Sequence, residues 1–139
     1  MTDSTSLGRT IGRLAFGAGL LFAGTTHLTV AREEFQAQVP TWLPLDPDLV
    51  VIGSGVVELA LGAALVALPK HRVPVGLAAA AFFIAIFPGN ISQFVTHTDA
   101  FGLNSDTARG VRLLLQPLLV LGVLWGTAAW RDRRSLVAK

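Results

Sequence analysis

One acidic residue, Glu58, lies in the middle of a long apolar stretch of the sequence. A helix rises about 1.5 Å per residue, so Glu58 lies about 15 Å along a helix that begins near Asp48. An unpaired charge buried in hydrocarbon costs several kcal/mol. We therefore expect the Glu58 side chain to face the interior of the protein, either protonated or paired with a basic group.

The last apolar stretch carries the basic residue that is best placed to pair with Glu58. Arg112 is expected about 7 Å along that helix, and Gln116 follows one turn later on the same face. In the third apolar stretch, Pro88 removes a helical hydrogen bond and leaves a carbonyl that needs another donor. Estimated depth places six polar residues in one half of the bundle, and these form the predicted ligand-binding site: His27, Glu58, Asn90, Gln93, Arg112 and Gln116.

Two interpretations of this site remain open. In the first, Glu58 and Arg112 form a buried ion pair that only locks the helices together. In the second, they orient the polar head group of a small molecule, such as a quinone, in a pocket. A metal site on His27, His97 and Glu58 is disfavoured because no two of them have i, i+4 spacing, so no metal is predicted. Nucleophilic catalysis has no support, because the Gly-x-Ser-x-Gly motif is missing from the sequence.

The elements that must position these residues are four apolar stretches. Only 14% of the 139 residues are charged, against about 25% in an ordinary soluble domain. Each stretch reaches the roughly 17–25 residues that a helix needs to cross a bilayer, and none has the polar face of a soluble helix. We therefore expect one all-α domain over residues 1–139, a bundle of four transmembrane helices covering about 10–30, 48–68, 73–97 and 108–130.

The distribution of charge predicts how the chain is oriented. Most basic residues fall at the N-terminus, in the link between the second and third stretches, and in the tail: Arg9, Arg13, Lys70, Arg72, Arg131, Arg133, Arg134 and Lys139. By the positive-inside rule, both termini are cytoplasmic and the protein is a multi-pass protein of the cell membrane. The first stretch also has the charged and apolar regions of a signal peptide, but it is long for one and has no clean cleavage site.

Composition also restricts the partners. The sequence contains no cysteine, which excludes disulfides, thiol redox couples and Fe–S clusters. The net charge is only +2 and no basic block is present, so nucleic acid is not an expected partner. The lipid bilayer is the expected surrounding. Gly122 and Gly126 have the spacing of a helix contact motif, which we interpret as the ordinary abundance of glycine in membrane helices rather than as a dedicated dimer motif.

Five short motifs recur in an order that carries a resemblance to a known family. They are Ala23-Gly24 with His27, Val39–Pro44, Ser54–Glu58 with Gly62, Phe87–Ile91, and Arg112–Pro117. Together they resemble the DoxX-like family of small bacterial membrane proteins, from about Gly12 to Trp130. Leu28 departs from the pattern, because relatives often have an aromatic residue after the histidine. The resemblance implies a four-helix integral membrane protein.

Some relatives are associated with sulfur-compound:quinone oxidoreductases, or with membrane complexes that handle thiol and oxidative stress. The resemblance therefore implies an accessory or partner-binding subunit of a membrane redox or stress-related assembly, with an oxidoreductase as its partner. One alternative is a quinone-interacting oxidoreductase subunit, in which Glu58 and Arg112 bind the quinone head group or relay its proton. Another is a carrier for a small solute. A quinone is the one cofactor class considered, and the sequence does not decide whether the chain is itself an enzyme.

Overall fold

The fold is all-α within the residues that the structure describes. The computed structural model describes residues 5–29, 39, 42–88, 91 and 105–137, without the side chains of His27, Asp106 and Arg109. No strand occurs in these ranges. The elements are α1 (Leu7–Leu28), α3 (Pro47–Ala67), α4 (Arg72–Ala85) and α6 (Asp106–Gly126), with two short 3-10 helices, η1 (Pro69–His71) and η2 (Arg133–Leu136).

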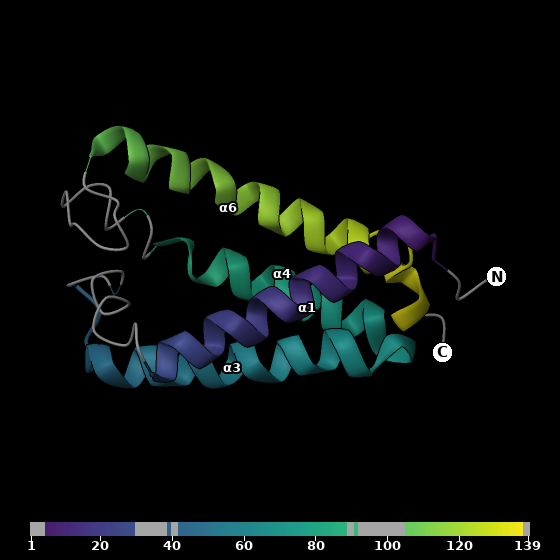
Figure 1. Cartoon of the computed structure of the whole chain (residues 1–139), viewed down its shortest axis with the longest axis horizontal. Coiled ribbons are helices and arrows are strands. Elements are labelled where there is room, and N and C mark those ends of the chain that lie inside the picture. Colours follow the sequence, from purple (N-terminus) through teal and green to yellow (C-terminus); the bar gives the residue numbers. More distant parts are fainter. Residues whose placement is uncertain (1–4, 30–38, 40–41, 89–90, 92–104, 138–139) are drawn as a thin grey trace.

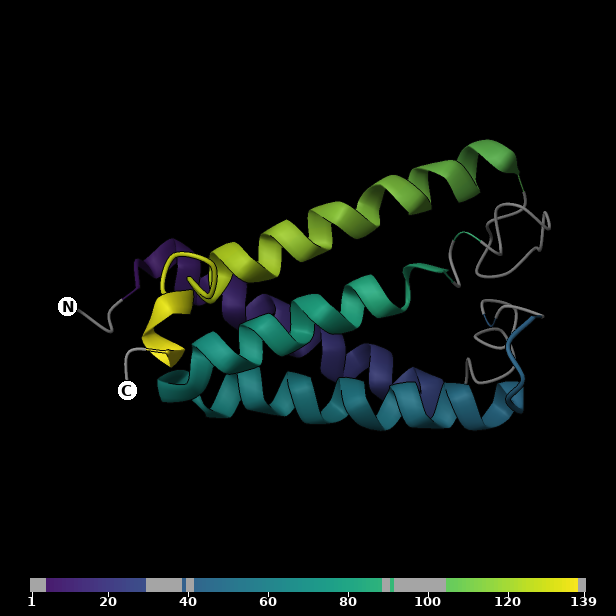
Figure 2. The same ribbon diagram turned by 180° about the vertical axis from the view of Figure 1, so that it is seen from behind.

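The four helices form an antiparallel bundle (Figure 1). Helix α1 packs mainly on α3 and α4 mainly on α6, while further contacts join α1 to α6 and α3 to α4. The two chain termini lie at the same end of the bundle, where α3 and α6 end and α1 and α4 begin. In both views, α6 diverges from α3 with increasing distance from the end that holds the termini (Figure 2).

Helix starts are fixed by side-chain caps that the sequence contains. The Ser6 hydroxyl accepts a hydrogen bond from the Arg9 N–H at 3.2 Å, and the Ser105 hydroxyl accepts one from Ala108 at 3.1 Å. Asp46 caps α3 through the Asp48 N–H at 3.0 Å, with Pro47 at the first helical position. These starts lie within about three residues of the predicted ones. Beyond Pro88, the predicted third helix lies outside the described residues, apart from Ile91.

The fourth helix ends earlier than predicted, at Gly126 instead of about residue 130. Ala128 has a positive φ of 54°, and its N–H donates to the Trp125 carbonyl at 3.0 Å. The Ala129 N–H donates to the Leu124 carbonyl at 3.0 Å. These two bonds form a Schellman motif, which ends the helix and reverses the chain. Because an alanine occupies the position that glycine usually takes there, residue type alone did not indicate this boundary.

Close contacts between glycines bring α1 and α3 together. A Cβ at Gly24 would lie 2.8 Å from the Gly55 carbonyl oxygen, and one at Gly62 would lie 2.8 Å from the Gly17 carbonyl oxygen. The backbones therefore approach more closely than any larger residue would allow. Gly126 likewise packs on the backbone of α1, because a Cβ there would lie 2.9 Å from the Arg13 nitrogen. Gly126 therefore packs against α1 within the same chain.

Arginines satisfy carbonyls at the end of the bundle that holds both termini. Pro69 has no N–H for the Leu65 carbonyl, and the buried Arg13 guanidinium donates to that oxygen instead. Arg9 donates to the Trp125 carbonyl at 2.6 Å. Arg72, also buried, donates to the Thr127 carbonyl at 2.9 Å. Each cation lies at a helix C-terminus, where the helix dipole favours positive charge.

Asp132 holds the tail against the start of α4. Its carboxylate accepts hydrogen bonds from Arg131 at 2.8 Å and from Arg72 at 2.9 Å. The hydrogen bond from Arg131, together with that from Arg72, lowers the pKa of Asp132 from its ordinary 3.8 to about 2, although burial acts in the opposite direction. The ionised form of Asp132 is therefore favoured in the folded protein.

One of the described helices, α3, is long and apolar enough to cross a membrane. The apolar part of α6, Gly110–Gly126, is shorter than the length that a membrane-spanning helix needs. Length and composition within the described residues thus identify one candidate span.

Replacing Gly62 by alanine should lower the free energy of unfolding by about 1–3 kcal/mol, because the new methyl group would meet the backbone of α1. Gly53, on the same helix, has nothing within 4 Å of the point where a Cβ would lie. Gly53→Ala should therefore be neutral or stabilising by up to about 1 kcal/mol. Denaturation followed by circular dichroism measures both. Equal effects of the two changes would contradict the close contact.

The contribution of Asp132 to stability should depend on acid pH. Because the folded-state pKa is lowered, the stabilisation is fully present above about pH 4 and is lost as pH falls through about 2. The stability difference between the wild type and Asp132→Asn should shrink over that window, as measured by denaturation at a series of pH values. A difference that stays constant from about pH 5 to about 2 would argue against the role of the ionised carboxylate.

Candidate functional site

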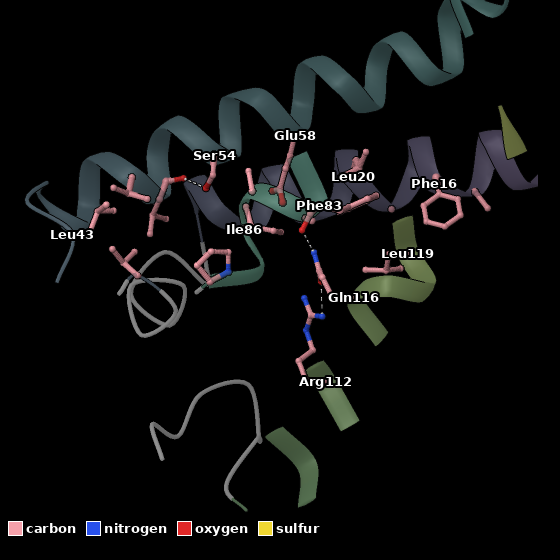
Figure 3. Close-up of a pocket in the computed structure, with 18 of the residues that line it drawn as sticks. Phe16, Leu20, Leu43, Ser54, Glu58, Phe83, Ile86, Arg112, Gln116 and Leu119 are labelled. Carbon is pink, nitrogen blue, oxygen red and sulfur yellow. Dashed lines mark hydrogen bonds between the residues drawn. The ribbon is translucent and has the colours of Figure 1, made fainter. Parts of the chain in front are cut away.

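A pocket of about 690 Å³ lies among the four helices, toward the end where α3 begins (Figure 3). Apolar side chains from all four helices line most of it, together with Trp42 and Leu43 from the segment before α3. Its volume is within the range of small-molecule sites in proteins. Four polar residues also line the pocket: Ser54, Glu58, Arg112 and Gln116.

Gln116 is the central polar residue of the site. Its side chain is 1% exposed, and its Nε2 donates to the Phe83 carbonyl oxygen at 2.6 Å. Helix α4 ends at Ala85, so carbonyls of its last turn need donors from outside the helix. The Gln116 amide on α6 supplies one of these donors. Its Oε1 in turn accepts a hydrogen bond from the Arg112 guanidinium at 2.9 Å.

Glu58 faces the interior, as predicted. It lies on α3, eleven residues after Pro47, or about 16 Å along the helix axis. The residue is 4% exposed. Figure 3 shows its side chain extending from α3 toward the Phe83 carbonyl and Gln116. An acidic group therefore lies on one wall of the pocket and a basic group, Arg112, on the opposite side.

Among the hydrogen bonds and ion pairs between described residues, none joins Glu58 directly to Arg112. The ion pairs between described residues are Arg72–Asp132 and Arg131–Asp132. Arg112 donates instead to Gln116, its neighbour one turn later on α6. Gln116 lies between Arg112 and Glu58 in Figure 3. Depth along the helices predicted the level of both charged groups correctly, but it carried no information on the distance between α3 and α6.

Three of the six predicted site residues are brought together: Glu58, Arg112 and Gln116. His27 lies on α1, close to its end at Leu28, and its side chain is not described. Asn90 and Gln93 lie outside the described residues, so their part in the site stays a prediction.

The Phe83 carbonyl is the site group that sequence reasoning missed. Backbone carbonyls carry no residue signature, but Pro88 indicated that α4 is interrupted nearby. Ser54 also lines the pocket, and its hydroxyl donates to the Val51 carbonyl on the same helix at 3.0 Å. Within the described residues, no group of three or more histidines or acidic residues is arranged to hold a metal.

The site combines polar groups with apolar walls. A guanidinium, an amide and a carboxyl group line one region of a pocket whose other walls are apolar. Such a site can form hydrogen bonds with the polar end of a molecule while burying the apolar remainder. The fold and the site together define a helical bundle with an internal pocket.

The chain belongs to a family whose function is not known. Residues 16–127 match the model of the family described as "Domain of unknown function (DUF8561)". The match includes α3, α4 and the pocket residues Glu58, Arg112 and Gln116. No curated protein and no solved structure matches the chain.

Replacing Gln116 by methionine should lower the free energy of unfolding by about 1–3 kcal/mol, because the buried Phe83 carbonyl loses its donor. Leu114→Met, on the exposed side of the same helix, should change stability by less than about 0.5 kcal/mol. Denaturation of both variants measures the effect. Amide hydrogen exchange should also become faster in the last turn of α4 in Gln116→Met alone. Unchanged exchange there would contradict the capping role of Gln116.

Proposed function

We propose that this protein is a multi-pass membrane protein whose pocket binds a small, largely apolar molecule through that molecule's polar head group. The quinones are the class that we favour, because they combine an apolar tail with hydrogen-bond acceptors on the ring. The observation that carries the proposal is the apolar pocket with Glu58, Gln116 and Arg112 on its wall. Each of these groups can hydrogen-bond a head-group oxygen when it carries a proton.

The outward faces of the helices support a lipid environment. Leu114 of α6 is 71% exposed, and large apolar side chains are exposed on all four helices: Ile11, Phe22, Val56, Val66, Ile84, Leu118 and Leu121. In water, the outer face of a helical bundle is polar. An apolar exterior around an interior that holds Glu58, Arg13 and Gln116 is the arrangement expected in a bilayer. The apolar span of α3 agrees with this.

The positions of charge support the proposed orientation. The end of the bundle that holds both termini carries most of the described basic residues, which the positive-inside rule places in the cytoplasm. The pocket lies toward the other end, where α3 begins. In this orientation, the pocket belongs to the outer half of the bilayer.

The resemblance to the DoxX-like family supports a related role as an accessory subunit that binds an oxidoreductase. A quinone-binding pocket is compatible with that role, because the chain has no cysteine and would depend on a quinone or a partner for electron transfer. Isolation from native membranes with such a partner would support it. A solute carrier needs access to its site from both sides of the membrane in turn. The described residues give no observation that supports such access.

The binding proposal can be tested by filling the pocket. Gly19 lines the pocket and has nothing within 4 Å of where a Cβ would lie, so leucine fits there without a clash at its first carbon. Gly19→Leu should abolish binding of decyl-ubiquinone, a short-chain quinone, measured by calorimetry with a detergent blank. Gly53→Leu is the matched control, because Gly53 is equally open but does not line the pocket.

Arg112→Gln should weaken the same binding by about tenfold or more, the usual effect of losing a hydrogen bond from a charged group. Circular dichroism must first establish that each variant is folded. Equal binding by the wild type, Gly19→Leu and Arg112→Gln would reject the pocket as a quinone site. Loss of binding in Gly53→Leu as well would attribute the effect to a general change in the bundle.

A further inference from the structure

We propose that the end of the bundle that holds both termini binds the head groups of anionic phospholipids. This inference rests on the membrane part of the proposed function and concerns a surface distant from the pocket. Among the described side chains at this end, one acidic group, Asp132, accompanies seven basic groups: Arg9, Arg13, Lys70, Arg72, Arg131, Arg133 and Arg134.

Five of the seven basic residues at this end fall into two groups. Arg13 and Arg72 are buried and donate to the carbonyls of Leu65 and Thr127 inside the protein. The side chains of three others face outward: Lys70, Arg131 and Arg134. The first group serves the fold, whereas the side chains of the second group are exposed to the surroundings. Within the described part of this end, the acidic group near the outward set is Asp132, whose carboxylate Arg72 and Arg131 share.

The ion pair between Arg72 and Asp132 joins these charges into one surface. Arg72 begins α4 next to Lys70 of η1, and Asp132 directly precedes η2, which packs on α4. The 2.9 Å bridge thus holds the link between α3 and α4 beside the tail. Basic residues that are about sixty positions apart in the sequence therefore meet at one end of the bundle.

Two tryptophans at this end favour a lipid head group over a soluble anion. Trp125 is 49% exposed and Trp130 is 59% exposed, and amphipathic indole rings are favoured at the level of lipid head groups. The guanidinium of Arg9 lies 5.3 Å from the ring centre of Trp125, and that of Arg133 lies 4.1 Å from the ring centre of Trp130. Arg133 is held there by its hydrogen bond to the Trp130 carbonyl at 2.6 Å.

The combined geometry matches the chemistry of an anionic phospholipid. The indole rings lie where the head group meets the acyl chains, and the outward Lys70, Arg131 and Arg134 lie where phosphate groups accept hydrogen bonds. A zwitterionic lipid offers a phosphate together with a compensating ammonium group. The surface should therefore select lipids with net negative charge, such as phosphatidylglycerol.

Quenching by brominated lipids tests this selection in reconstituted vesicles. In a Trp42→Phe background, the fluorescence comes only from Trp125 and Trp130. Brominated phosphatidylglycerol should compete for this site roughly fivefold better than brominated phosphatidylcholine, the ratio expected from the attraction of about one basic side chain. Raising the salt concentration to about 1 M should reduce the ratio, because the Debye length then falls to about 3 Å.

Two triple variants provide matched controls. Lys70→Gln with Arg131→Gln and Arg134→Gln should bring the ratio close to one, whereas Lys70→Arg with Arg131→Lys and Arg134→Lys should retain the selection. Circular dichroism establishes that both are folded. Selection that persists in the glutamine variant would reject this surface as its source.

The remaining outcomes separate this inference from the proposed function. Equal quenching by both lipids in the wild type would overturn the head-group site but leave the membrane proposal standing. If neither of the two lipids quenched the fluorescence, the membrane proposal would be overturned, and this inference with it. Loss of selection on adding glycerol phosphate at constant ionic strength would assign the surface to a soluble anion instead of a lipid.

Discussion

Backbone carbonyls at the ends of α3, α4 and α6 accept hydrogen bonds from side chains on other elements, and the arrangement of the bundle depends on these bonds. Arg13 binds the Leu65 carbonyl, Gln116 the Phe83 carbonyl and Arg72 the Thr127 carbonyl. At the end of α3, the need arises because Pro69 offers no N–H. In an apolar surrounding such carbonyls have no water to bind, so each cross-helix donor fixes where its own helix must lie.

Gln116 connects this structural requirement to the pocket. Its amide nitrogen completes the end of α4, while its oxygen receives the Arg112 guanidinium at the pocket wall. The same side chain thus serves the fold and positions a charged group at the pocket wall. A buried amide can do both because it is a donor and an acceptor at once.

The sequence was informative wherever chemistry depends on residue type and local spacing. It predicted the helical class, the inward position of Glu58 and the neighbourhood of Arg112 and Gln116, which follows from their i, i+4 spacing. It failed where the answer depends on geometry between helices: depth along α3 and α6 could not measure the separation of Glu58 from Arg112. It also missed the turn at Ala128, because the positive φ there is unusual for alanine.

The glycine contacts divide the bundle into unequal parts. Gly24 and Gly62 bring the backbones of α1 and α3 together at two levels, whereas Gly126 brings α6 against α1 only near the end that holds both termini. Glu58 is carried by α3, and Arg112 and Gln116 are carried by α6 beyond that contact. The spacing between the acidic and basic groups is therefore set by how far α6 diverges from α3 beyond Gly126.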